Sequence, residues 1–171
     1  MEERVQIMDF LNTDDIALEL DARGKSAALD ALAATLSRRT GIAKDRLLTA
    51  LNARERLGST AINHGVAIPH AHLDDLAKPA AAFARLEQPV DFSAQDGGLV
   101  DVVFAFIWPT HCKDGFLQNL APMCRLLRQP ELLAQLRQAT SAEEIGQCLN
   151  AAHEQTPLPR QGPRSVSQLR A

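Results

Sequence analysis

Aromatic residues and positive charge are both scarce in this sequence. It contains no tyrosine and one tryptophan, and aromatic residues make up 4% of its 171 residues. A protein that stacks nucleic-acid bases on aromatic side chains needs more of them. The formal net charge is −3 and the pI is about 5.9, whereas a dedicated nucleic-acid binder usually shows a basic face. These shortages argue against nucleic acid as a partner.

Cysteines and long apolar runs are scarce as well. The three cysteines, Cys112, Cys124 and Cys148, form no C-x-x-C pair, so neither a disulfide framework nor a zinc site is predicted. The run Met1-Glu2-Glu3-Arg4 lacks the apolar core of a signal peptide. The longest apolar run, residues 102–108, is far shorter than the roughly 20 residues of a membrane span. We therefore expect a cytoplasmic protein without a membrane-spanning part.

The remaining composition is that of a globular domain. Hydrophobic residues make up 46% of the chain, enough for a sizeable core. Segments with a period of two residues alternate with segments of helical period. Strands are predicted at residues 16–20, 60–72, 80–86 and 100–108, the third ended by Gln88-Pro89; helices are predicted to begin near Ser26, Lys44, Asp114, Pro130 and Ser141. Asp114 is the predicted cap of its helix, Pro122 should kink that helix, and Ser141 to Glu144 resembles a capping box.

The strand Val100–Trp108 sets the fold class. It is continuously apolar and rich in β-branched and aromatic residues, which is typical of a central strand covered on both faces. Strands and helices that alternate around such a strand indicate an α/β layered domain. We expect this domain to span residues 1–152, with 20 acidic and 15 basic side chains, and residues 153–171 to form a disordered tail rich in proline and arginine.

Histidines gather in one stretch of the chain. His64, His70 and His72 lie within nine residues. Pro69 has a fixed φ and would deliver His70 on a stiff segment. An imidazole with a pKa of about 6.5 is a good nucleophile near neutral pH, and one ring nitrogen could attack a phosphorus atom. Arg54 could clamp the phosphoryl oxygens with its planar guanidinium. Phosphoryl transfer through a histidine is therefore the first interpretation.

Two other interpretations of these residues stay open. His70 and His72 would point to one face of a strand, and with His64 or His111 they could form a three-histidine metal site, although nothing fixes the third ligand. Histidines beside glycine and proline can also be ordinary polar loop residues, and Arg54 at a helix end can simply favour the helix dipole. For His64 this plain interpretation is preferred. No cofactor or metal is expected.

Longer motifs resemble a known family. The runs Arg54-Glu55-Arg56-Leu57-Gly58-Ser59-Thr60 and Gly65-Val66-Ala67-Ile68-Pro69-His70 are similar to the motif of the type-2 IIA domains of the bacterial phosphoenolpyruvate-dependent phosphotransferase system. The similarity extends from about Ile16 to Leu149. Within this family the chain resembles the nitrogen-regulatory branch more than the fructose and mannitol types, because of its Leu-Gly-Ser-Thr and Ala-Ile-Pro-His runs.

The resemblance implies a fold, a reaction and partners. The fold would be α/β, a mixed β-sheet flanked by α-helices on both faces. His70 would accept a phosphoryl group on Nε2 from the phosphohistidine of a small HPr-type carrier, and Arg54 would be the active-site arginine. The nitrogen branch acts as a signal that binds potassium-transport components and sensor kinases according to its phosphorylation state.

The chain departs from the family pattern at two positions. Many relatives carry a second active-site histidine where this chain has Phe116, which cannot hydrogen-bond a phosphoryl oxygen; the nearest histidine, His111, comes five residues earlier. Many relatives also have a lysine two residues after the phosphorylated histidine, where this chain has His72. We predict that His72 or His64 partly replaces the missing donors.

The leading hypothesis is a phosphocarrier and regulator that is phosphorylated on His70, and whether it counts as an enzyme stays open. One alternative is a binding-only module that has lost efficient phosphotransfer, which Phe116 favours. Another is a fructose- or mannitol-type sugar component. The acidic domain suits a basic face on the carrier, and we expect an apolar rim near the site, including Phe116, as the docking surface.

Overall fold

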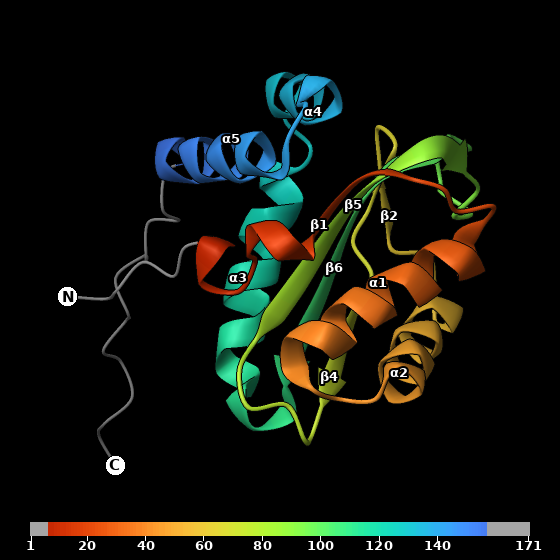
Figure 1. Cartoon of the computed structure of the whole chain (residues 1–171), viewed down its shortest axis with the longest axis vertical. Coiled ribbons are helices and arrows are strands. Elements are labelled where there is room, and N and C mark those ends of the chain that lie inside the picture. Colours follow the sequence, from red (N-terminus) through yellow and green to blue (C-terminus); the bar gives the residue numbers. More distant parts are fainter. Residues whose placement is uncertain (1–6, 157–171) are drawn as a thin grey trace, which may run out of the picture.

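The apolar run predicted as a central strand forms β6 (Val100–Pro109), in the middle of a six-stranded sheet (Figure 1). The computed structural model describes residues 7–156. On one side, β6 pairs in antiparallel fashion with β5 (Ala80–Val90), and β5 pairs in parallel with the edge strand β1 (Ile16–Leu20). The prediction of a central strand is confirmed.

On its other side, β6 carries two short parallel strands. β3 (Val66–Ala67) pairs with its first half and β4 (His70–Leu73) with its second half. β2 (Ala61–Asn63) pairs with β3 in antiparallel fashion as a hairpin. The sheet is therefore mixed, as the resemblance implied. β3 and β4 lie end to end along β6, with Ile68 and Pro69 between them.

Two helices cover one face of the sheet. α1 (Lys25–Thr40) and α2 (Lys44–Arg56) lie on the same side of the strands in Figure 1. Their leucines pack into one buried cluster with alternate residues of β6, which are Val103, Ala105 and Ile107. The period of two along β6 thus sends every second side chain to this face.

Three helices cover the opposite face. α3 (Lys113–Leu126), α4 (Pro130–Gln138) and α5 (Ala142–Gln155) form a second buried cluster with the other residues of β6, Val102, Phe104, Phe106 and Trp108. The short 3₁₀ turn Ile7–Asp9 adds Ile7 to the same cluster. The expected arrangement of helices on both faces is confirmed. Among residues 7–156, no helix combines the length and apolar character that a membrane crossing needs.

Several sequence predictions about elements and their boundaries need correction. The single strand predicted over residues 60–72 is instead divided into β2, β3 and β4, with a hairpin turn between the first two. β5 does not stop before Gln88-Pro89 but runs through them to Val90, because its pairing with β6 shifts register after Arg85 and a bulge tolerates proline. α3 begins at Lys113, so Asp114 is its second residue and not its cap. The helix is unbroken at Pro122, and the kink predicted there stays a prediction.

The last helix is also longer than predicted. Ser141 caps α5 by accepting a hydrogen bond from the Glu144 amide, but the Glu144 carboxylate binds the amide of Thr140 instead of that of Ser141. α5 runs to Gln155, three residues past the predicted boundary at 152. Most of the predicted tail, residues 157–171, lies outside the described residues.

Candidate functional site

His70 opens strand β4 and is held firmly by the backbone around it. In the pairing of β4 with β6, His70 lies opposite Phe106. The amide of Phe106 donates a hydrogen bond of 2.8 Å to the carbonyl of Pro69, the residue before His70. Ile68 is 2% exposed, and its amide donates to the carbonyl of Thr60 at 3.0 Å. The imidazole is therefore carried by a segment that is fixed on both sides.

Two hydrogen bonds define the protonation of the His70 ring. Nδ1 lies 2.9 Å from the carbonyl oxygen of Ile68, and Arg54 donates from Nε to Nε2 at 3.0 Å. A carbonyl oxygen can only accept, so Nδ1 carries the proton. A guanidinium can only donate, so Nε2 presents its lone pair. The ring is neutral, with Nε2 as its nucleophilic atom.

The surroundings of His70 favour this neutral form. Burial is the largest cause that lowers the pKa of His70 below its ordinary value of 6.5, and the charge of Arg54 and the neighbouring His72 lower it further. The hydrogen bond to Ile68 and the carboxylate of Glu55 act in the opposite direction without reversing the shift. The lone pair on Nε2 is thus available at neutral pH.

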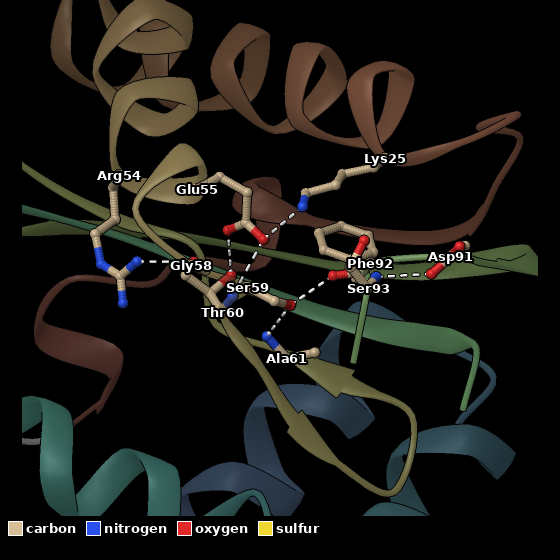
Figure 2. Close-up of polar contacts among 10 residues, drawn as sticks. All are labelled: Lys25, Arg54, Glu55, Gly58, Ser59, Thr60, Ala61, Asp91, Phe92 and Ser93. Atoms are coloured by element: carbon tan, nitrogen blue, oxygen red, sulfur yellow. Dashed lines mark hydrogen bonds and ion pairs between the residues drawn. The ribbon is translucent and has the colours of Figure 1, made fainter. Parts of the chain in front are cut away.

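Arg54 comes from the last turn of α2 and is aimed by the loop that follows. Its Nη1 donates to the carbonyl of Gly58 at 2.9 Å (Figure 2). Gly58 has φ 153, outside the range that other residues readily adopt, and its amide donates to the carbonyl of Glu55. The tight turn after α2 therefore fixes one edge of the guanidinium while the Nε edge faces His70.

A buried carboxylate holds this loop. Glu55 is 7% exposed and accepts hydrogen bonds from the amide and the hydroxyl of Thr60, at 3.1 and 2.6 Å. It also forms an ion pair with Lys25 at 2.8 Å (Figure 2). Ser59, between them, donates to the carbonyl of Phe92 and accepts from the amide of Ala61. Glu55 was not among the residues predicted for the site. It follows Leu47 and Leu51 at intervals of four residues, so the sequence places its charge on the buried face of α2, and this position could have marked it as a residue of interest.

Phe116, from the first turn of α3, closes the other side of the site. Its ring centroid lies 5.5 Å from that of His70 and 4.2 Å from that of His72, in an edge-on arrangement with the latter. The side chain is 7% exposed and packs against Phe106 and Trp108. Phe116 is therefore a buried support for both histidine rings and does not form the exposed rim that was expected of it.

His72 borders a depression next to the site. This depression, about 480 Å³ in volume, lies between α2 and β4. It is lined by residues that include Ala53 beside Arg54, and by charged groups, which are Asp45, Arg46 and Asp74. His72 thus faces the same helix that supplies Arg54. Of the supporting histidines considered from the sequence, the structure brings His72 to His70.

His64 and His111 are placed differently. His64 and Gly65 form the two-residue turn of the β2–β3 hairpin, with φ 57 and 78, as a type I′ turn requires. Gly65 bonds to Asp101 of β6, whereas His70 pairs with Phe106, so the two histidines lie roughly 16 Å apart at about 3.3 Å per residue. The structure therefore removes His64 from the site. His111 is exposed in the 3₁₀ turn Thr110–Cys112, and no ring contact or hydrogen bond joins it to His70 among the described residues.

The three-histidine metal site considered from the sequence is not formed within residues 7–156. No group of three histidine, cysteine, aspartate or glutamate side chains gathers there in a way that could hold a metal ion. Cys112, Cys124 and Cys148 are free thiols.

Fold and sequence together define the class of this protein. Residues 9–152 match the family described as phosphoenolpyruvate-dependent sugar phosphotransferase system, EIIA 2, and the chain belongs to that family.

Within the family, the chain is similar to nitrogen regulatory proteins. A nitrogen regulatory protein of Bradyrhizobium diazoefficiens is 38% identical over 139 residues, which cover 81% of this chain and 91% of that protein. One from Klebsiella oxytoca is 29% identical, over 86% of this chain and 92% of its own length. The crystal structure of the nitrogen regulatory protein IIA-Ntr from Neisseria meningitidis superposes with a TM-score of 0.81 at 29% identity, covering 84% of this chain and 98% of that one. The structure of IIA mannitol from Escherichia coli, 20% identical over 81% of this chain and 98% of that chain, shares the fold with a TM-score of 0.68.

Proposed function

We propose that this protein is a phosphoryl-accepting regulator of the nitrogen phosphotransferase type, modified on His70 by an HPr-type carrier in the cytoplasm. The observation that carries this proposal is the neutral imidazole of His70, whose Nε2 lone pair faces the guanidinium of Arg54. The similarity to nitrogen regulatory proteins supports the branch. By analogy with that branch, downstream partners would be potassium-transport components or sensor kinases.

The chemical step follows from the two hydrogen bonds of the ring. The Nε2 lone pair forms a bond to phosphorus while the bond from phosphorus to the carrier's imidazole nitrogen breaks, and the electron pair of that bond stays on the carrier's ring. The carrier's phosphohistidine ring enters the step protonated on its other nitrogen and leaves as a neutral imidazole, so the His70 ring gains the positive charge that the carrier's ring loses. The carbonyl of Ile68, which accepts from Nδ1, stabilises this charge and keeps the proton in place. No other group has to gain or lose a proton.

Arg54 has to move during this step. Its Nε–H now points at the lone pair that attacks, at 3.0 Å, and therefore occupies the position of the incoming phosphorus. Arginine binds phosphoryl oxygens in a planar, bidentate way, so the guanidinium can leave Nε2 and bind the transferred group from the same helix end. We expect a small rotation of Arg54 and no large change of the backbone.

Two exposed leucines frame the site as a docking surface. Leu57, next to the turn that holds Arg54, is 85% exposed, and Leu117, next to Phe116, is 70% exposed. Large apolar side chains this exposed, on both sides of a reactive group, are suited to contact a partner. The neighbouring depression carries Asp45 and Asp74, which suit a basic face on the carrier.

Phosphorylation with the purified system tests the proposal. Incubation with phosphoenolpyruvate, the first enzyme of the system and an HPr-type carrier should give an acid-labile phosphate that is absent in His70→Ala. His72→Ala should slow labelling about three- to tenfold, because one hydrogen-bond donor to the phosphoryl group is worth about 1 kcal/mol, and His64→Ala should not. Unlabelled wild-type protein with every carrier tried would support the binding-only module, which the phenylalanine at position 116 favours. Equal labelling of all three histidine variants and wild type would contradict both the acceptor and the role of His72.

A further inference from the structure

The buried Glu55 has no part in the phosphoryl step proposed above, yet it lies at the centre of the hydrogen bonds around the site. A carboxylate buried among leucines is costly unless its oxygens are fully bonded. Those of Glu55 are bonded to the Thr60 amide, the Thr60 hydroxyl and the Lys25 ammonium (Figure 2). Thr60 is itself 5% exposed, so Glu55 and Thr60 meet inside the protein, while Lys25 reaches them from the surface with 27% of its side chain exposed.

One chain of contacts leads from Glu55 to Nδ1 of His70. Glu55 fixes Thr60 through two hydrogen bonds. The carbonyl of Thr60 accepts from the amide of Ile68 at 3.0 Å, which extends the pairing of β2 with β3 by one rung. The carbonyl of Ile68 then accepts from Nδ1 of His70 at 2.9 Å. The position of Thr60 therefore sets the position of the carbonyl that selects the tautomer of His70.

A second chain leads from Glu55 to Arg54. The loop between Glu55 and Thr60 is closed at both ends by Glu55, whose carbonyl accepts from Gly58 and whose carboxylate holds Thr60. Within this loop the carbonyl of Gly58 accepts from Nη1 of Arg54 at 2.9 Å. Releasing Thr60 would free the loop, and the carbonyl of Gly58 would no longer hold the guanidinium beside the His70 ring, from where it binds the phosphoryl group in the proposed step.

We propose that Glu55 is a positioning residue that fixes the Nδ1-protonated tautomer of His70 and the orientation of Arg54, acting on both through Thr60. Its hydrogen bonds to Thr60 carry this role, and the weak effect of its charge on the pKa of His70 is separate. A glutamine can keep both contacts, since its carbonyl oxygen accepts from the Thr60 amide and its NH2 group donates to the Thr60 hydroxyl once that hydroxyl turns. The effect on phosphoryl transfer rests on the proposed function, whereas the effect on the His70 tautomer does not.

The test compares Glu55→Ala with Glu55→Gln and a matched control. Asp30→Asn removes the other ion pair between α1 and α2, that of Asp30 with Lys44 at 3.0 Å, which is exposed and has no connection to the site. The first readout is the pair of ¹⁵N chemical shifts of the His70 imidazole without any carrier, which report the tautomer. The second is the initial rate of labelling from a phosphorylated HPr-type carrier. Circular dichroism checks that each variant is folded.

Glu55→Ala should move the His70 ring away from the Nδ1-protonated form and lower the labelling rate about tenfold. Glu55→Gln and Asp30→Asn should keep the wild-type shifts and stay within about threefold of the wild-type rate. If Glu55→Ala does not fold, Thr60→Val is the variant that tests the proposal, because it removes only the contact of the Thr60 hydroxyl with Glu55. This variant should shift the His70 tautomer in the same direction and slow labelling severalfold.

Three results would overturn the positioning role: wild-type shifts in folded Glu55→Ala or Thr60→Val, an equal loss in Asp30→Asn, or a Glu55→Gln variant as impaired as Glu55→Ala. A wild-type protein that accepts no phosphate would refute the proposed function alone, since the shifts still report the tautomer.

Discussion

At the scale of single residues, the fold creates an unusual imidazole. Burial beside Phe116 lowers the pKa of His70, and the carbonyl of Ile68 selects which nitrogen carries the proton. A histidine on an open loop would exchange between tautomers and would be protonated in part near neutral pH. Under the proposed function, His70 would thus be in its nucleophilic form before any partner binds.

The lowered pKa of His70 predicts a pH-dependent stability. The unfolded chain takes up a proton near pH 6.5, before the folded protein does, so the contribution of His70 to the free energy of unfolding is fully present above about pH 6.5. It is lost as the pH falls from there through the lower folded pKa. Urea unfolding at about pH 7.5 and about pH 5.5 should show a loss of stability in wild type that is missing in His70→Gln.

The other histidines provide the control for this prediction, because they are present in both proteins and their effects cancel. Parallel losses of stability in wild type and His70→Gln on acidification would show that the His70 pKa is not lowered in the folded protein.

At the scale of elements, a hydrogen bond attaches the β2–β3 hairpin to helix α4. Arg137 of α4 donates to the carbonyl of His64 and forms a two-bonded pair with Asp101 of β6, at 2.9 and 2.8 Å. Gly65 sits directly against this pair. The hairpin leads straight into Ile68 and His70, so its attachment steadies the strand that carries the site.

Gly65→Ala should therefore destabilise the protein strongly. Gly65 has φ +78, and an added Cβ would lie 2.7 Å from Nη2 of Arg137 and 2.9 Å from Oδ1 of Asp101. Backbone strain of about 1 kcal/mol and the displaced, partly exposed ion pair together should cost about 2 kcal/mol, measured by urea unfolding. Gly41→Ala is the matched control, because Gly41 has φ +76 with nothing within 4 Å and should cost about 1 kcal/mol. Equal costs at the two sites would show that the Arg137 pair yields without penalty.

The elements also show which features of the fold and the site could be predicted from the sequence. Local periodicity predicted the central strand and the helix that carries Arg54, and the motif around His70 predicted the family, because these signals lie within short segments. The placement of His64 could not be predicted, since it depends on which part of β6 each short strand pairs with. The continuation of β5 through Pro89 depends on a bulge that only the partner strand defines, and the contact of Phe116 with both rings depends on where α3 packs.

At the scale of the whole molecule, charge is the feature that a partner meets first. The full chain carries a net charge of −3, and Asp45 and Asp74 line the depression beside the site. Long-range attraction of a basic partner to such a surface raises the rate of association and is screened by salt.

Phosphorylation of this protein by a basic carrier should therefore slow as salt is added, by about tenfold between low and high ionic strength. An Asp45→Asn, Asp74→Asn double variant should be slower at low salt and less sensitive to salt, with the same rate as wild type at high salt. The measurement is the initial rate of labelling at limiting carrier concentration. A rate that salt leaves unchanged would show that docking depends on the apolar contacts alone.

Under the proposed function, the fixed backbone position of His70 also determines how the phosphorylated and unphosphorylated forms would differ. The carbonyl of Pro69 is bonded to β6, and Ile68 is buried, so a group added to the ring has no backbone that it could easily shift. A phosphoryl group brings nearly two negative charges. The modified and unmodified forms would then share one backbone shape and differ in local electrostatic potential, so a receptor would tell them apart by charge: cations favour the phosphorylated form and carboxylates the unmodified one.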